Sequence, residues 1–129
     1  MTQNNIDTMN IIVDLMKHGT SISTALKRVY SKRNFAIPYN DEMLNVDVRK
    51  IGMTARTTNA LMREHLYTIN DIVKYCQDDK ITTIKNLGRS SGVEIFEKIL
   101  DYCWGHMNND ERTNFLIDTV ERNETFIRI

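Results

Sequence analysis

The sequence predicts an all-α protein, a compact bundle of short helices with an N-terminal helical hairpin and a C-terminal helix. Apolar residues recur at spacings of three and four along most of the chain, which is the helical period. No run of alternating β-branched and aromatic residues is long enough to indicate a strand. Pro38 is the only proline in 129 residues, so little in the sequence interrupts helix formation.

Length and composition bound the class of protein. A chain of 129 residues that is 41% hydrophobic and 26% charged fits one soluble domain with at most an appendage. Its apolar runs are far shorter than the roughly 18 residues needed to cross a membrane. Residues 1–5 lack the positive charge and apolar core of a secretory signal. The two cysteines, Cys76 and Cys103, cannot build a disulfide framework, so we expect a cytoplasmic protein.

The net charge of zero hides an asymmetry between the two halves of the chain. Residues 1–63 carry nine Lys or Arg against five Asp or Glu, a balance of +4. Residues 64–129 carry eight against twelve, a balance of −4. Because a protein that coats nucleic acid is usually basic throughout, any anion site in this protein must be local.

Two helices are predicted at the N-terminus. Five apolar residues at helical spacing mark the first: Ile6, Met9, Ile12, Val13 and Met16. His18-Gly19 ends this helix as a C-terminal cap does. Ser21 or Ser23 can cap the second helix, which ends near Arg33.

A module boundary follows these two helices. Pro38 and the polar residues 39–41 mark a turn, so we divide the protein into a helical hairpin, residues 1–40, and a helical domain, residues 41–129. A hairpin of this size buries too little apolar surface to fold alone, and it must pack on the rest of the protein or on a partner. Whether its apolar stripe serves a core or a homodimer interface stays open at this stage.

The domain begins with two capped helices. Thr54 can cap a helix that reaches His65, and Thr68 with Asp71 three positions later can cap the next helix, Ile69–Cys76. Later in the sequence, residues 108–122 form an amphipathic helix with four apolar positions: Phe115, Leu116, Ile117 and Val120.

The segment between residues 81 and 95 carries the clearest functional pattern. A tight turn that ends in Gly88 leads into a helix through Cys103, and Gly88 permits a sharp bend and a close approach of another molecule. Ser90 and Ser91 leave the first amides of that helix accessible, and exposed amides at a helix start suit a phosphate. This pattern indicates a helix-hairpin-helix turn, which grips a nucleic-acid backbone without reading its sequence. A simple connection between helices is the alternative.

Three motifs in order resemble the C-terminal domain of the bacterial RNA polymerase α subunit, over roughly residues 46–104. They are Thr-Ala-Arg-Thr-Thr-Asn-Ala-Leu at 54–61, His-Leu-Tyr-Thr-Ile-Asn-Asp-Ile-Val at 65–73, and Ile-Lys-Asn-Leu-Gly-Arg-Ser-Ser at 84–91 followed by Glu94-Ile95. That family shows Val-Arg-Ser-X-Asn-X-Leu, Ile-X-Thr-Ile-X-Asp-Leu and Asn-Leu-Gly-Lys-Lys-Ser, with Glu-Ile closing the set. Each motif alone is weak, and the ordered set is specific.

The resemblance implies a domain that binds the minor groove of A/T-rich promoter DNA. Arg56 would enter the groove with Asn59 beside it, and spacing independently places these two residues on one helical face. An arginine suits the concentrated negative potential of a narrow minor groove. Glu94 would support Arg56. Four residues would meet the phosphates: Gly88, Arg89, Ser90 and Ser91.

Two departures from the family pattern bear on partners. Ser90 stands where the family usually has a second lysine, which weakens one phosphate contact although Arg89 keeps a positive charge beside it. Arg49 and Lys50 stand where the family often has an acidic patch that meets the σ factor. A reversed charge cannot make that contact, so these two cations would attract DNA or an acidic partner instead.

We therefore expect a DNA-binding accessory or regulatory protein of transcription, whose partners would be RNA polymerase, σ factor or a transcription factor. Dimers or a tethering partner would raise its modest affinity. The alternative is a protein-interaction module that mimics the polymerase domain without binding DNA strongly, and binding of branched DNA ranks third. The three scattered histidines and two distant cysteines predict neither catalysis, a metal nor a cofactor.

Overall fold

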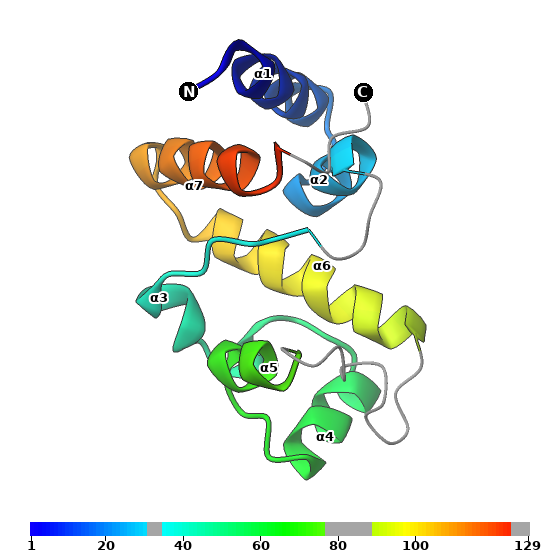
Figure 1. Cartoon of the computed structure of the whole chain (residues 1–129). Coiled ribbons are helices and arrows are strands. Elements are labelled where there is room, and N and C mark those ends of the chain that lie inside the picture. Colours follow the sequence, from blue (N-terminus) through cyan, green and yellow to red (C-terminus); the bar gives the residue numbers. More distant parts are fainter. Residues whose placement is uncertain (31–34, 77–88, 125–129) are drawn as a thin grey trace. The chain divides into compact units, whose positions relative to one another are not determined.

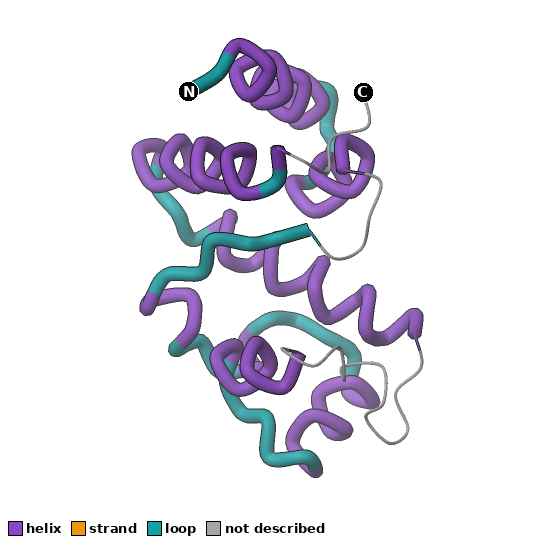
Figure 2. The backbone as a smooth tube through the Cα atoms, in the orientation of Figure 1, coloured by secondary structure: helices purple, strands orange, loops and turns teal. Residues whose placement is uncertain are grey.

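The computed structural model describes residues 1–30, 35–76 and 89–124, except for the side chains of 89–91 and 93. The elements in these residues are helical (Figure 1): α1 Gln3–Lys17, α2 Ile22–Tyr30, α3 Asp41–Leu44, the 3₁₀ helix η1 Val48–Lys50, α4 Ala55–Arg63, α5 Ile69–Cys76, α6 Arg89–Gly105 and α7 Asn109–Arg122. The one β pairing among them is an isolated antiparallel bridge between Asp47 and Thr68. Figure 2 draws helices and loops, and no strand, among the described residues. The all-α prediction is confirmed. No helix in the described ranges is long and apolar enough to span a membrane.

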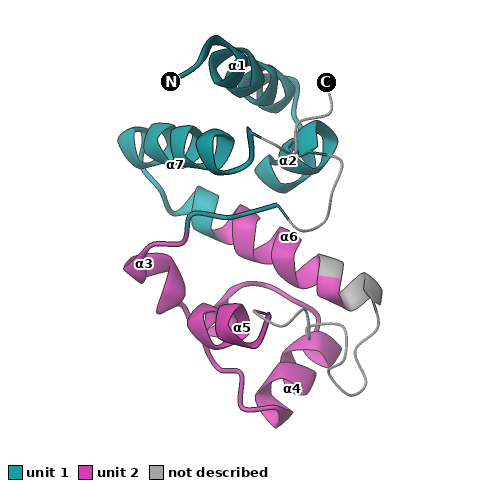
Figure 3. Ribbon diagram, in the orientation of Figure 1, with its two compact units in different colours: residues 1–38, 103–129 teal, residues 39–102 magenta. Residues whose placement is uncertain are grey.

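The contacts divide the protein into two compact units (Figure 3). Unit 1 is residues 1–38 and 103–129, and unit 2 is residues 39–102, so the boundary falls within α6. The sequence suggested a hairpin at 1–40 and a domain at 41–129, whereas the structure groups α7 with the N-terminal helices. Compactness does not say which segments fold independently, so the division at residue 40 stays a prediction.

In unit 1, α1 packs against both α2 and α7. The predicted C-terminal cap of the first helix and the predicted N-terminal cap of the second are confirmed. His18 is the C-cap of α1, and Gly19 follows it with a φ of +94°, a conformation that glycine adopts without strain. Ser21 is the residue that caps α2, because its hydroxyl accepts a hydrogen bond from the Thr24 amide at 3.3 Å. The predicted end of this second helix near Arg33 lies outside the described residues.

The buried face of α1 differs from the apolar face that the sequence predicted. Ile12 is fully buried, but Ile6 is 37% exposed, and the polar residues Asn5 and Thr8 are buried instead. Both polar side chains make hydrogen bonds: the Asn5 amide nitrogen donates to Glu124 at 3.2 Å, and the Thr8 hydroxyl donates to the carbonyl of Asn4 at 2.8 Å. These hydrogen bonds offset the cost of burying polar groups, and periodicity alone could not reveal them.

Asn123, the C-cap of α7, ties the segment before unit 2 to this helix. It is fully buried, and its side-chain oxygen accepts a hydrogen bond from the amide of Ala36 at 2.6 Å. Its side-chain nitrogen donates to the carbonyls of Ala36 at 2.7 Å and Thr119 at 2.8 Å. One side-chain amide thus pairs both polar groups of a backbone residue 87 positions away, as a neighbouring strand would.

Unit 2 holds α3, η1, α4, α5 and most of α6. Its core consists of apolar residues from all five elements and the turns between them: Met43, Val48, Ile51, Ala60, Leu61, Leu66, Ile69, Ile72, Ile95, Ile99 and Leu100. The α3 helix packs against α5, and η1 packs against α4. The sequence had indicated only a turn near residues 39–41, where Asn40 in fact caps α3 by accepting a hydrogen bond from the Met43 amide.

We expect Asn123→Ala to lower the free energy of unfolding by about 2 kcal/mol, because the variant leaves the two backbone groups of Ala36 without the side chain that pairs them, whereas the carbonyl of Thr119 keeps the backbone amide of residue 123. Urea unfolding followed by circular dichroism measures this change. Asn114, exposed on the same helix, supplies the matched control, and Asn114→Ala should change the stability by less than about 0.5 kcal/mol. Equal effects of the two variants would contradict the role of Asn123.

Candidate functional site

Helix α4 presents the two residues that the sequence predicted to contact DNA. Arg56 is exposed and Asn59 is accessible on the same helix, where residues three apart lie on one face. The start of α4 is set by Thr54, which has extended backbone angles and accepts a hydrogen bond from the Thr57 amide at 3.3 Å. The predicted cap is therefore confirmed, and it fixes where on the helix Arg56 lies.

The opposite end of α4 is closed by a Schellman motif. The His65 amide donates to Met62 at 3.1 Å and the Leu66 amide to Leu61 at 2.9 Å, while His65 has a φ of +59°. This backbone conformation ends α4 at Arg63, so the expectation that the helix reaches His65 was wrong. The imidazole of His65 hydrogen-bonds the Tyr67 hydroxyl at 2.7 Å.

Glu94 of α6 contacts the start of α4. Its carboxylate oxygen Oε1 accepts a hydrogen bond from the backbone amide of Thr54 at 3.2 Å. Glu94 lies 40 positions further along the sequence, and it therefore fixes the first turn of α4 against α6. The sequence assigned Glu94 a supporting role toward Arg56, and a hold on the helix that carries Arg56 is one way to perform that role.

The electrostatics of this helix end favour an anion. Backbone amides at a helix start carry about half a positive charge, and Arg56 in the first turn adds a full one. No acidic residue lies in the first turn of α4, which is described in full. The Glu94 carboxylate offsets part of this positive potential. The Arg56 and Asn59 side chains carry N–H groups that can donate hydrogen bonds to phosphate or base-edge oxygens.

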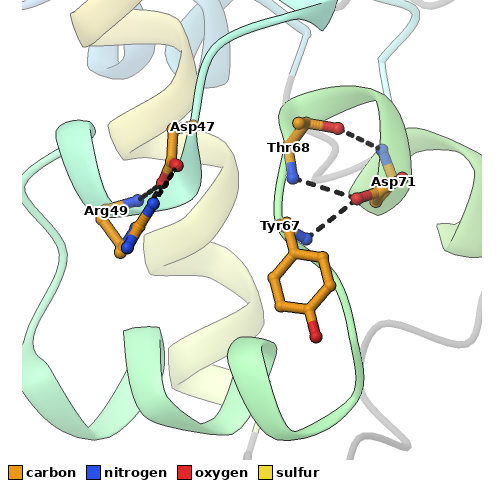
Figure 4. A network of polar contacts seen from close by, with 5 residues as sticks. All are labelled: Asp47, Arg49, Tyr67, Thr68 and Asp71. Atoms are coloured by element: carbon orange, nitrogen blue, oxygen red, sulfur yellow. Dashed lines mark hydrogen bonds and ion pairs between the residues drawn. The ribbon is translucent and has the colours of Figure 1, made fainter.

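Arg49 and Lys50, the predicted partner or DNA contacts, lie in η1, and Arg49 is paired with Asp47 (Figure 4). The Arg49 guanidinium makes two contacts with the Asp47 carboxylate, from Nε at 3.0 Å and from a terminal nitrogen at 2.7 Å. The Arg49 amide donates a third hydrogen bond to the same carboxylate at 2.8 Å. The side-chain and backbone hydrogen bonds from Arg49 lower the pKa of Asp47 to about 2. The charge of Arg49 is thus largely compensated within the domain.

The turn before α5 holds η1 in place. The Val48 amide donates to the carbonyl of Tyr67, and the Ile69 amide donates to the carbonyl of Val46. Asp71 accepts from the amides of Tyr67 and Thr68 at 2.9 and 3.1 Å, and the Thr68 hydroxyl accepts from the Asp71 amide at 3.2 Å (Figure 4). This reciprocal cap confirms the predicted role of Thr68 and Asp71, and it positions the segment that carries η1.

The predicted phosphate contacts fall largely beyond what the structure describes. Gly88 lies outside the described residues, as do the side chains of Arg89, Ser90 and Ser91. The backbone of α6 begins at Arg89, so Ser90 and Ser91 occupy its first turn as the sequence predicted. Their contact with phosphate stays a prediction.

The role of Asp47 was not predicted from the sequence. An aspartate two positions before an arginine at a short helix start is a local signal for both capping and ion pairing, and residues 47–49 carry that signal. Within the described ranges, no group of three or more His, Cys, Asp or Glu side chains is placed to hold a metal ion.

Comparison with known proteins gives the family. The family model for the C-terminal domain of the bacterial RNA polymerase alpha subunit matches residues 37–101, half of the sequence, and covers the described residues of α4 and η1. The protein belongs to this family. The match extends the region that the sequence motifs marked, 46–104, toward the N-terminus and includes α3.

Three relatives of this protein are alpha subunits of DNA-directed RNA polymerase. The DNA-directed RNA polymerase subunit alpha of Mesomycoplasma hyopneumoniae strain 7448 is 48% identical over 52 residues, which is 40% of this protein and 15% of that one. The subunit of Chlorokybus atmophyticus is 30% identical over 74 residues, 57% of this protein and 23% of that one. That of Aster yellows witches'-broom phytoplasma strain AYWB is 24% identical over 119 residues, 92% of this protein and 33% of that one.

The 129 residues therefore span only 15–33% of the length of these relatives. The phytoplasma alignment covers nearly all of them, including helices of unit 1 that lie outside the family match. No solved structure matches the sequence.

We expect the low pKa of Asp47 to depend on Arg49. A group whose pKa is lowered to about 2 from 3.8 stabilises the fold above pH 3.8, and this contribution is lost as the pH falls toward 2. In Arg49→Gln the pKa of Asp47 should rise toward 3.8, and acid unfolding should begin at higher pH. Carbon-detected NMR titration of the carboxyl group gives the pKa directly.

Lys50→Gln is the matched control, because the Lys50 side chain lowers the pKa of the Asp47 carboxyl only through a weaker coulombic attraction. The pKa of Asp47 should stay close to 2 in this variant. A rise of equal size in both variants would show that general positive charge, rather than the hydrogen bonds from Arg49, lowers the pKa.

Proposed function

We propose that this member of the α C-terminal-domain family binds DNA and acts in transcription as an accessory or regulatory protein. It docks on the minor groove of A/T-rich promoter DNA, with Arg56 in the groove and Asn59 at the base edges or backbone. Residues 88–91 meet the flanking phosphates. No catalytic step is part of this function.

The observation that carries the proposal is the accessibility of Arg56 and Asn59 on one face of a helix whose start is fixed twice, by the Thr54 cap and by Glu94. Because the helix that carries the guanidinium is already fixed, its insertion into a narrow groove requires no further ordering of the backbone. Membership of a family named for a polymerase subunit supports the role in transcription.

A second candidate is a protein-interaction module that takes the place of the polymerase domain at a transcription factor, σ factor or polymerase. The ion pair between Asp47 and Arg49 favours it, because a compensated arginine attracts a polyanion less and leaves Lys50 as the stronger cation of η1. In that case the η1 surface recognises a specific partner, while α4 contributes little binding energy to DNA.

Arg56→Ala should weaken binding to an A/T-rich duplex about tenfold or more, because it removes a minor-groove contact worth roughly 1–3 kcal/mol. Fluorescence-anisotropy titrations of labelled A/T-rich and G/C-rich duplexes at two salt concentrations measure this effect. The wild type should prefer the A/T-rich duplex and bind more weakly at high salt.

Lys74→Ala removes one positive charge from the exposed side of α5 in the same unit and serves as the control. It should lower affinity for both duplexes to the same small extent. Equal losses for Arg56→Ala and Lys74→Ala would contradict the minor-groove mechanism. Absence of wild-type binding at low salt, well above micromolar protein, would favour the interaction module.

Glu94 should act on DNA binding through the position of α4. Glu94→Ala removes the acceptor for the Thr54 amide, so this amide should exchange its hydrogen faster and the affinity for A/T-rich DNA should fall several-fold. Glu94→Gln keeps an acceptor oxygen and should retain slow exchange and affinity. Both variants remove a negative charge, which by itself favours DNA binding. A loss of affinity in Glu94→Ala that is absent in Glu94→Gln would therefore identify a positioning effect.

A further inference from the structure

Unit 1 contains a pocket that the proposed DNA site does not involve. It is an open pocket of about 590 Å³ at the start of α1, beside the end of α7. Its lining combines polar, acidic and aliphatic side chains: Thr2, Asn4, Asn5, Asp7, Thr8, Ile11 and Glu124. Among the described residues, this lining includes no lysine or arginine.

Asn5 lines this pocket and has an acceptor without a hydrogen-bond partner among the described residues. The residue is 2% exposed, and its side-chain nitrogen donates to Glu124 Oε2 at 3.2 Å. Its oxygen Oδ1 is buried and has no hydrogen-bond partner among the described residues. A buried carbonyl oxygen without a donor costs free energy, so a donor that enters beside it gains more than it would at an exposed position.

The charge around the pocket is negative. Asp7 and Glu124 bring two carboxylates, and the start of α1 opposes them with about half a positive charge. The backbone amide of Asn5 is already satisfied by the Thr2 hydroxyl at 3.2 Å, which further reduces the attraction of this helix end for an anion. The balance therefore favours a cation. Ile11, 36% exposed, adds an aliphatic wall.

We propose that this pocket binds the side chain of an arginine in a basic segment of a partner protein. An arginine has an aliphatic stem, which suits Ile11, and a planar group of several donors that can address Asn5 Oδ1 and the Glu124 carboxylate together. Because Oδ1 is buried, the arginine must displace side chains that line the pocket to reach it, and the lining residue Glu124 is exposed. Lysine offers a compact charge that cannot bridge two acceptors in the same plane.

The test is an NMR titration of the 129-residue protein with three capped tripeptides: acetyl-Ala-Arg-Ala-amide, its lysine analogue and its citrulline analogue. Citrulline has the shape of arginine without the charge. The arginine peptide should shift the side-chain amide signals of Asn5 and the backbone signals of residues 2–8 and 124. We expect a Kd on the order of 1 mM for one isolated side chain, with weaker binding of lysine and none of citrulline.

Glu124→Gln, at an exposed position, keeps an acceptor for the Asn5 amide and removes the charge, so it should weaken the arginine peptide about fivefold. Glu121→Gln removes the same charge from an exposed position on α7 outside the pocket and should change the Kd by less than about twofold. Equal effects of the two variants, equal binding of the arginine and lysine peptides, or unchanged Asn5 side-chain signals would each overturn the proposal. DNA binding plays no part in this test, so its result is independent of the function of α4.

Discussion

The first turn of α4 is the constraint on which the candidate site depends. A helix of nine residues is marginal on its own, because nucleation is costly and few hydrogen bonds repay it. The helix persists because Thr54 caps its start, Glu94 binds the amide of that cap, and residues 61–66 close its other end. Each of these contacts also fixes the rotation of the helix, and with it the direction in which Arg56 and Asn59 are presented.

The predicted caps were correct because their signals are local. Thr54 with Thr57, and Thr68 with Asp71, are three positions apart, and a side chain can satisfy an amide at that distance in any context. The buried face of α1 was not predictable in this way. Asn5 is buried against Glu124, 119 positions away, so its burial depends on contacts that periodicity cannot contain. The side chain of Asn123, the C-cap of α7, likewise pairs both backbone groups of Ala36, which lies 87 positions earlier in the sequence.

The candidate site shows the same division between local and distant information. The residue types and spacing of Arg56 and Asn59 place them on one accessible face, and the structure agrees. The sequence treated Arg49 and Lys50 as two equivalent cations, although their environments differ. The Asp47 carboxylate accepts three hydrogen bonds from Arg49. Among the described contacts Lys50 reaches only the Asp47 carbonyl, through its backbone amide, so the structure distinguishes two charges that the sequence could not.

Compensation of Arg49 has a consequence for how a domain of this kind would hold DNA. Each phosphate contact contributes about 0.9 to the logarithmic salt dependence of binding, so the loss of one cation from the DNA-facing set means lower affinity and a shallower slope. In the proposed mode of DNA binding, stable occupancy would then require a second attachment, because tethering converts a weak contact into an intramolecular one. Unit 1 carries a negatively charged pocket, and an attachment through a basic segment of a protein partner fits that chemistry better than a second contact with DNA.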